Sequence, residues 1–232
     1  MSHTHLLYSA RHAFVATLLI AVLGVCSFFA FEPSVGRAIT DEFTVTQEIT
    51  DEISFSTFAQ NVAMEGSITG LSGGFATGST MAVIRSNDAQ GYTMKLHFST
   101  TSSGRSMQAS STAYINDYSP AVASVADFHW ITNSSGGAAE FGYSVTASNT
   151  AEVDLTFLND GASACATGSS NTANRCWINP TTSPETLVSS TGPTAASTTT
   201  IKFKVAVPNA PSPALPTGFY LATGTLTATN NP

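Results

Sequence analysis

Apolar and polar side chains alternate with a period of two through most of this chain. The segment Gly91–Ser99 (GYTMKLHFS) has aromatic or aliphatic side chains at the even positions and polar ones or glycine at the odd positions. The segment Ser197–Pro208 repeats this pattern, with Ile201, Phe203 and Val205 on one side of the chain and Lys202 and Lys204 on the other. This alternation is typical of strands with one buried face. Helical spacing is nearly absent after Phe31, so we expect an all-β protein.

Further strands are predicted wherever this alternation recurs between turn residues such as Ser135-Gly136-Gly137. About eight to ten strands favour an antiparallel β-sandwich, of jelly-roll or immunoglobulin-like type. Ser99–Ala113 is predicted to be a surface loop, and the proline-rich Pro208–Pro216 an extended connector. The other predicted strands are Phe43–Ile49, Ile53–Phe55, Met81–Arg85, Val125–Trp130, Phe141–Ala147, Val153–Phe157 and Phe219–Thr229.

The first part of the chain has the composition of a targeting segment. Ala13–Phe31 contains no charged side chain and follows Arg11. Its length of about 19 residues suits either a long signal peptide or a retained N-terminal membrane anchor. Small residues at Gly36 and Ala38 suit cleavage after residue 38. We therefore expect residues 1–38 to be a signal or anchor helix and residues 39–232 to be one β-sandwich domain.

Two cysteines follow this segment, Cys165 and Cys176. An even pair in an exported domain predicts a disulfide, which would close a short loop of small polar residues. The targeting segment and the disulfide together predict an extracellular or cell-surface location.

Charge excludes one class of partner. The chain carries a formal net charge of −7 and only 8 Lys and Arg residues. Nucleic-acid binders instead gather basic residues in clusters, so nucleic acid is not an expected partner. Contact with a membrane is expected only through the N-terminal segment, where that segment is not cleaved.

Residues that suit metal binding or catalysis are sparse. His97 and His129 lie on polar sides of their strands, and no metal-binding histidine motif is present. Asp88 and Asp160 lie in turns and are candidate calcium ligands, although Asn-Asp and Asp-Gly are also common turn residues for backbone reasons alone. No other cofactor is expected. No nucleophile or paired-carboxylate motif stands out, so we do not expect an enzyme.

Trp130 and Trp177 are the two tryptophans of the chain. Trp177 directly follows Cys176, where a large ring can pack against the disulfide as part of the core. The alternative is that Trp177 projects outward as a flat platform for a sugar ring.

Thr40–Ile53 (TDEFTVTQEITDEI) is an alternating segment with acidic residues among its polar positions. Its apolar side chains Phe43, Val45 and Ile49 share one side. The segment can pair within its own sheet as a first strand, or it can be donated to the open edge of a neighbouring subunit.

The closing sequence LPTGFYLATGTLTATNNP, with the preceding strand TTIKFKVAV and the long apolar leader, resembles the exported all-β surface proteins of bacteria. These include fimbrial-type subunits and spore-coat or biofilm-matrix proteins. The resemblance implies self-association, or association with other cell-surface proteins, through main-chain strand pairing.

Three functions are therefore carried forward as hypotheses. The first is an exported structural or adhesive surface protein, a subunit of an extracellular filament or matrix assembled by strand complementation through Phe43, Val45 and Ile49. The second is a carbohydrate-binding module of the cell surface, with glycans as partners. The third is a secreted hydrolase.

Overall fold

The computed structural model describes residues 14–26, 41–132 and 135–232. The chain divides into two units, Met1–Glu48 and Ile49–Pro232, which are described separately. In the first unit, residues 14–26 form a helix and residues 41–48 form neither helix nor strand. Within the described ranges, no helix has the length and apolar character needed to cross a membrane. The predicted cleavage site and the 38/39 domain boundary lie outside the described residues.

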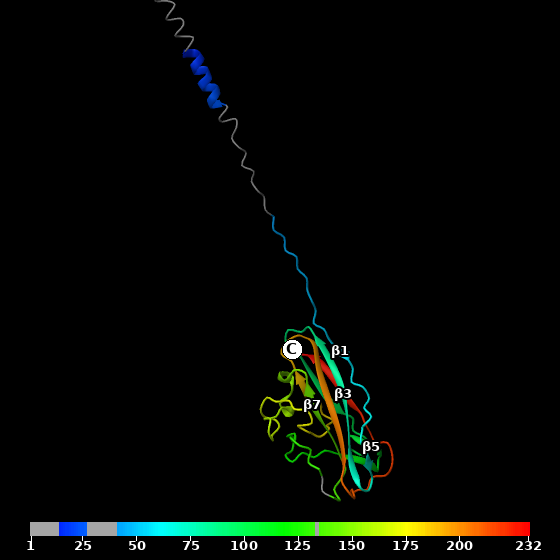
Figure 1. Cartoon of the computed structure of the whole chain (residues 1–232). Coiled ribbons are helices and arrows are strands. Elements are labelled where there is room, and N and C mark those ends of the chain that lie inside the picture. The colour runs from blue at the N-terminus through cyan, green and yellow to red at the C-terminus, as the bar shows by residue number, and fades with distance from the viewer. Residues whose placement is uncertain (1–13, 27–40, 133–134) are drawn as a thin grey trace, which may run out of the picture. The chain divides into compact units, whose positions relative to one another are not determined.

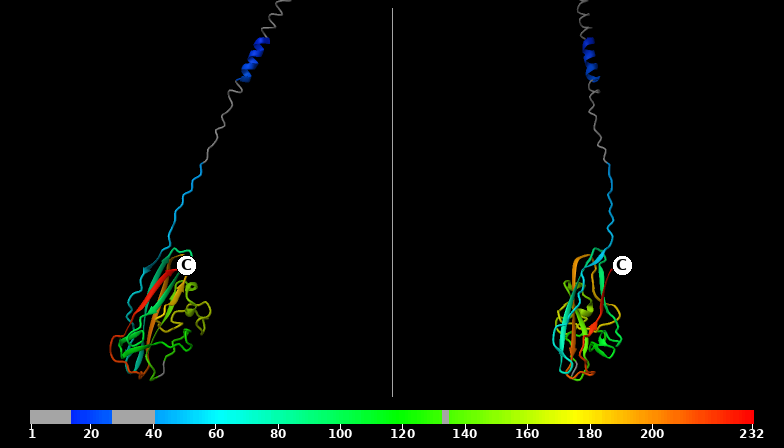
Figure 2. Two further views of the ribbon diagram at one scale, coloured as in Figure 1. Left: turned by 180° about the vertical axis from the view of Figure 1, so that it is seen from behind. Right: turned by 90° about the vertical axis from the view of Figure 1, so that its right-hand side faces the viewer.

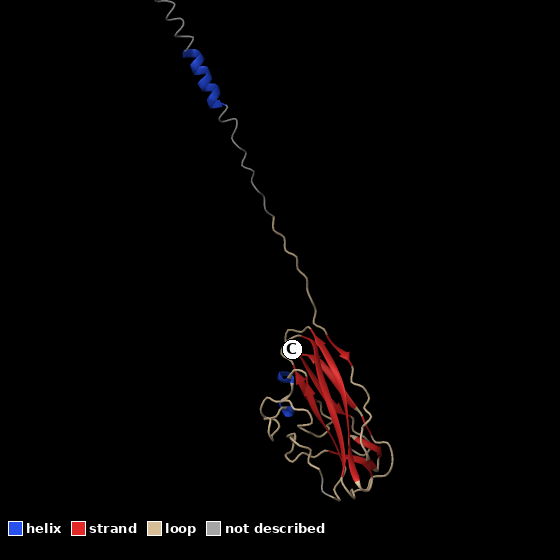
Figure 3. Cartoon of the chain, in the orientation of Figure 1, coloured by secondary structure: helices blue, strands red, loops and turns tan. Residues whose placement is uncertain are grey.

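The second unit is built mainly of strands (Figure 3). Eight of them form one sheet in the order β1-β3-β9-β7-β6-β5-β10, with β2 also paired to β3. Three form a second sheet in the order β11-β4-β8. The strands are β1 (Ile53–Thr57), β2 (Ile68–Thr69), β3 (Gly73–Ser86), β4 (Tyr92–Phe98), β5 (Met107–Ser110), β6 (Ala113–Asp117), β7 (Glu140–Ala147), β8 (Glu185–Ser189), β9 (Thr194–Val207), β10 (Leu221–Ala222) and β11 (Gly224–Asn230). The all-β prediction is confirmed.

The two longest strands organise the larger sheet. β3 and β9 pair in antiparallel fashion from Gly74↔Val207 to Ser86↔Thr194 and run side by side along the unit (Figure 1). β9 contains the alternating segment predicted from residue 197 onward, and β3 extends well beyond the predicted Met81–Arg85. Thr, Ile and Val make up half of β9, which suits a pleated surface.

The larger sheet is mixed and not purely antiparallel. β6 and β7 pair in parallel, with Asn116 opposite Glu140 and Asp117 opposite Phe141. A parallel pair requires a long connection, and the chain supplies one between Asp117 and Glu140. The prediction of an entirely antiparallel fold is therefore wrong at this pair.

The hydrophobic core draws buried side chains from both sheets. On β4, the predicted inward face is confirmed, since Tyr92, Met94, Leu96 and Phe98 are each at most 3% exposed. The Phe98 ring lies against the larger sheet, 5.6 Å from Tyr143 and 5.9 Å from Phe141 between ring centroids. Packing in this core determines which face of the three-stranded sheet points inward.

The prediction of a strand over Val153–Phe157 is wrong. Two short 3-10 helices form there instead, η1 (Thr150–Glu152) and η2 (Leu155–Phe157). The side chains of Asn149 and Asp154 accept hydrogen bonds from the backbone N–H groups of Ala151 and Thr156. Side-chain caps of this kind favour turns over a sheet ladder. Leu155, expected to be inward, is consequently 55% exposed.

Two other local predictions are wrong. Val125–Trp130 forms only isolated bridges, of which Asp127 with Trp177 is one. The predicted loop Ser99–Ala113 contains strand β5, which pairs with β6. The proline-rich Pro208–Pro216 forms no strand, as expected, and contains a cis Ser212–Pro213 peptide bond.

The loops between β6 and β8 lie on one side of the long strands (Figures 1 and 2, green to yellow). They are attached to the larger sheet at Tyr143, which exchanges backbone hydrogen bonds with Ile178. A Cβ atom at Gly142 would lie 2.9 Å from the Trp130 ring and 2.9 Å from the Ile178 carbonyl oxygen. Glycine at this position therefore allows the loops to approach the outer face of β7 closely.

Candidate functional site

Strand β11 forms an open edge of the three-stranded sheet. It pairs with β4 over its whole length, from Gly224↔Phe98 to Asn230↔Tyr92. Just beyond its ends, Ser99 N–H donates to Thr223 O at 2.9 Å and Asn231 N–H donates to Gly91 O at 3.0 Å. Because hydrogen-bonded pairs alternate along an antiparallel ladder, the odd-numbered residues of β11 bond to β4. The backbone groups of Leu226 and Ala228 therefore point away from β4.

No strand of the described chain pairs with this outer side of β11. Natural edge strands are commonly protected by charged residues, proline or bulges. Gly224–Asn230 reads GTLTATN, which has no charge and no proline, and its pairing with β4 has no bulge. By contrast, the opposite edge strand of the same sheet, β8, begins with Glu185 and is bulged against β4. The β11 edge is thus chemically open to another strand.

A pocket of about 240 Å³, lined by both polar and apolar groups, lies beside this edge. Gly224 and Leu226 of β11 form part of its wall, together with core rings of both sheets and residues 59–62 and 64, which follow β1. A second pocket of about 370 Å³ shares Met64, Met107 and Tyr220 with the first and extends along β9. Apolar groups line most of the larger pocket, and polar and apolar groups share the smaller one. Both pockets can therefore accept apolar side chains.

The segment before β1 carries large apolar side chains that are exposed. Phe43, Val45 and Ile49 are 85%, 82% and 80% exposed. The predicted strand over Phe43–Ile49 is not formed within this chain. The backbone of this exposed segment can bond to water, and among the described residues no strand pairs with it.

Asn87 holds the first residues of the second unit. The Asn87 side chain donates to Thr50 O at 3.0 Å and accepts from Glu52 N–H at 2.6 Å, and Asn87 N–H donates to Glu52 O at 3.2 Å. These bonds fix residues 50–52 at the start of β1.

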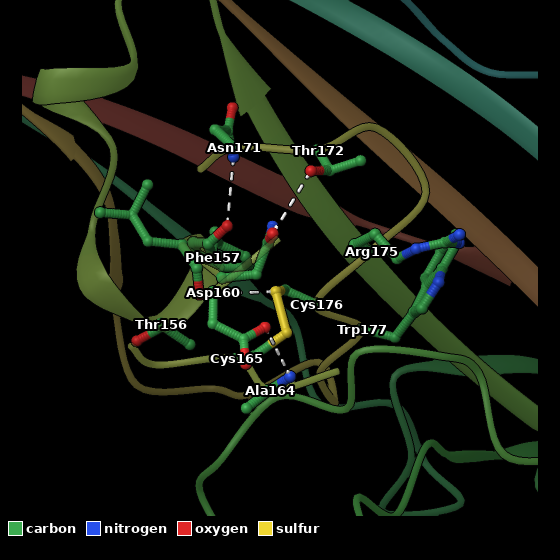
Figure 4. Close-up of a disulfide and its surroundings, with 12 residues drawn as sticks. Thr156, Phe157, Asp160, Ala164, Cys165, Asn171, Thr172, Arg175, Cys176 and Trp177 are labelled. Atoms are coloured by element: carbon green, nitrogen blue, oxygen red, sulfur yellow. Dashed lines mark hydrogen bonds between the residues drawn. A yellow bond between two sulfur atoms is a disulfide. The ribbon is translucent and has the colours of Figure 1, made fainter. Parts of the chain in front are cut away.

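The predicted disulfide between Cys165 and Cys176 is confirmed, with a Cα–Cα distance of 5.6 Å (Figure 4). It joins two turns of the loop-rich region, and Arg175 and Trp177 directly flank Cys176. The disulfide indicates an oxidising compartment.

Asp88 and Asp160, the two candidate calcium ligands, accept hydrogen bonds within the turns in which they lie. One Asp160 carboxylate oxygen accepts from the backbone N–H groups of Ala162, Ser163 and Ala164 at 2.8–3.0 Å. Hydrogen bonds from these backbone groups lower the pKa of Asp160. Asp88 is buried and accepts from Gln90 N–H at 2.8 Å. Across the described ranges, no group of three or more His, Cys, Asp or Glu residues is arranged to hold a metal ion.

Trp177, the candidate sugar platform, is 4% exposed. Its ring lies edge-on to Trp130 at 5.5 Å, and Trp130 stacks on Tyr118 at 4.1 Å. Asp127 is half-buried, although its alternation predicts an outward side chain, because its carboxylate accepts from Tyr118 Oη at 2.6 Å. Burial, followed by the bond to Asp127, raises the pKa of Tyr118.

Two features were missed in the sequence. The open edge of β11 was detectable in principle, since its strand carries Thr, Ala and Leu without a charge. The outward direction of Lys202 and Lys204 was predicted, but their position beside Trp130 and Trp177 was not. That arrangement depends on distant loops, which alternation does not describe.

Comparisons with protein-family models, with curated proteins and with solved structures gave no match to this chain.

Proposed function

We propose that this protein is an exported structural subunit of an extracellular filament or matrix, assembled by strand addition between copies. Residues 41–49 of one copy would pair with the outer side of β11 in the next. The observation that carries the proposal is the uncharged, unpaired β11 edge next to a pocket that core side chains help to line. No catalytic role is proposed.

The donor segment, residues 41–49, and the acceptor strand, β11, both have apolar side chains on one face. In an added strand, Phe43, Val45 and Ile49 would occupy one face because side chains alternate along a strand. On β11, Leu226 and Ala228 pack against the core. The apolar side chains of the donor would continue this inward face and enter the pocket beside it. The backbone groups of Leu226 and Ala228 would then gain the partners they lack.

We further infer that the two sheets form a β-sandwich whose interior is completed by this added strand. Core residues from both sheets and the contact of Phe98 with β7 support face-to-face packing. A strand donated by a neighbouring copy would cover this unprotected edge.

Electron microscopy of the secreted protein tests the proposal. Replacing Phe43, Val45 and Ile49 together by serine removes the apolar face of the donor and keeps its length. We expect filaments or ordered aggregates from the unaltered protein and monomers from the variant. A matched control replaces Thr44, Thr46 and Thr50 by serine, which retains the apolar face and should preserve assembly.

A second variant tests the acceptor. Ala228→Pro removes an N–H that points away from β4, so the ladder with β4 keeps its bonds. Thr227→Pro removes an N–H that donates to β4 and should destabilise the fold. A folded Ala228→Pro protein that still forms unchanged filaments would exclude the β11 edge as the acceptor.

A further inference from the structure

A third pocket lies on the outer face of the larger sheet, away from the core. It has a volume of about 330 Å³ and lies at the lower end of the roughly 300–1,000 Å³ usual for small-ligand sites. Lys202 and Lys204 of β9 contribute to it, since their side chains point outward beside Thr77 of β3. Its lining residues are Phe75, Thr77, His129, Trp130, Asn174, Arg175, Trp177, Lys202 and Lys204.

Positive charge is concentrated in this pocket. Arg175, Lys202 and Lys204 are three of the 8 Lys and Arg residues in a chain whose net charge is −7, and no lining residue is acidic. Partial burial, followed by the charge of Lys202, lowers the pKa of Lys204. A bound anion would offset this repulsion between the two ammonium groups.

Aromatic rings surround the central cation. The Lys204 ammonium lies 5.0 Å from the Trp130 ring centroid, 5.5 Å from Phe75 and 5.8 Å from Trp177. These distances are within the range of cation–π attraction, which holds the ammonium group in place without neutralising its charge. Phe75 is 62% exposed, so an apolar ring face is also open to solvent.

The wall of the pocket is held in place by bonds within the loops. Trp177 Nε1–H and an Arg175 Nη1–H both donate to Asn174 O, at 3.2 and 3.1 Å. The Arg175 guanidinium lies 5.0 Å from the Phe128 ring centroid. Cys176, between Arg175 and Trp177, is joined to Cys165 (Figure 4). The geometry is therefore built before any ligand arrives, which lowers the ordering cost of binding.

From this arrangement we propose that the pocket binds the carboxylate-bearing ring of an acidic saccharide, a uronic acid unit. The cations would bond the carboxylate, and the exposed aromatic face would pack against the C–H face of the sugar ring. β3 and β9 are paired on both sides in the sheet, so the floor offers no free backbone edge to a peptide strand. Recognition here would rest on side chains alone, which distinguishes this site from the β11 edge.

Calorimetric titration of the purified full chain with a short galacturonic acid oligomer tests the proposal. Lys204→Met keeps the aliphatic stem and removes the charge, and we expect it to weaken binding about tenfold, as for loss of a charge-assisted hydrogen bond. Lys95→Met makes the same charge change at an exposed position of β4 and should leave affinity unchanged. A neutral galactose oligomer should bind at least about tenfold more weakly than the acidic one.

Several results would overturn the proposal. Equal affinity for the acidic and neutral oligomers would show that the cations do not recognise the ligand. Acetate binding as tightly as the acidic oligomer would reduce the site to a simple anion site. Displacement of the oligomer by a peptide of residues 41–52 would assign the pocket to a protein segment. Equal losses of affinity in Lys204→Met and Lys95→Met would indicate nonspecific charge attraction. If circular dichroism shows that Lys204→Met is unfolded, Arg175→Met takes its place in the comparison.

Discussion

Strands such as β4 and β9, each paired on both sides within its own sheet, are stabilised differently from the disulfide-linked region between β7 and β8. In β4, every second side chain is buried, and the strand holds its place through burial and ladder hydrogen bonds. Between β7 and β8 the chain forms short 3-10 turns, Asx caps and a disulfide. Alternation therefore predicts a strand only where neighbouring strands supply backbone hydrogen bonds. Elsewhere, side-chain caps form turns in spite of the alternation.

The largest expected effect is loss of a core ring in the strand region. Phe98→Ala removes contacts to Phe141, Tyr143 and Phe203 and should cost about 3–5 kcal/mol of unfolding free energy. Leu155→Ala, in the loop-rich region, should cost less than about 0.5 kcal/mol because that side chain is exposed. Urea unfolding of both variants checks the contrast, and similar losses would contradict it.

Next in size is removal of the disulfide. Replacing Cys165 and Cys176 by serine releases a loop with a sequence separation of 11, which should cost about 2–3 kcal/mol in the chain-entropy model. Amide hydrogen exchange should quicken most across residues 159–176. Exchange that quickens equally in β4 and β9 would show that the loop region is not a separate stabilising unit.

Glu152 links the two regions. It is 9% exposed in η1, and its carboxylate accepts from Tyr92 Oη at 3.2 Å, from Ser197 Oγ and from Asn149 Nδ2 at 3.0 Å. Burial raises the pKa of Tyr92 to about 12, so its hydroxyl remains a donor at neutral pH. Glu152→Ala should cost about 1–3 kcal/mol by leaving buried hydroxyls unpaired.

Glu152→Gln is the matched control for this position. It keeps an acceptor oxygen of similar size and should lose less stability than Glu152→Ala in thermal unfolding. Equal loss in the two variants would mean that the side-chain volume matters there and the hydrogen bonds do not.

The smallest expected effect concerns Asp160. Backbone N–H groups lower its pKa below 3.8 in the folded state. A lowered folded pKa gives stability that is full above the unfolded pKa and is lost as pH falls through the folded value. Asp160→Asn should therefore remove part of the stability loss seen below pH 3.8. Identical acid-unfolding curves for variant and parent would contradict this role.

The strand framework was largely predictable from the sequence. The alternation in β4, β7 and β9 depends on residues two apart, and each predicted inward face is buried at Phe98, Tyr143 and Ile201. The parallel β6–β7 pair was not predictable, because the direction of pairing is set by a long connection and not by the strand itself. At Asp154 the side-chain cap was a local signal that competed with the alternation and prevailed.

The candidate sites were predictable to different degrees. The donor residues Phe43, Val45 and Ile49 were identified from their alternation, and the structure leaves them exposed. The acceptor edge required the strand order, since only the order places β11 at the end of a sheet. The basic and aromatic pocket required Trp130 and Lys204 to meet across 74 residues of sequence, which only the folded loops determine.

Residue-resolved hydrogen exchange at β11 tests strand addition most directly. It uses the chain lacking residues 41–49 with an added peptide of residues 41–52. The amides of Leu226 and Ala228 point outward, so we expect fast exchange without the peptide and slow exchange with it, while Thr227 stays protected by β4 in both states. Peptide binding that leaves Leu226 and Ala228 in fast exchange would contradict the account.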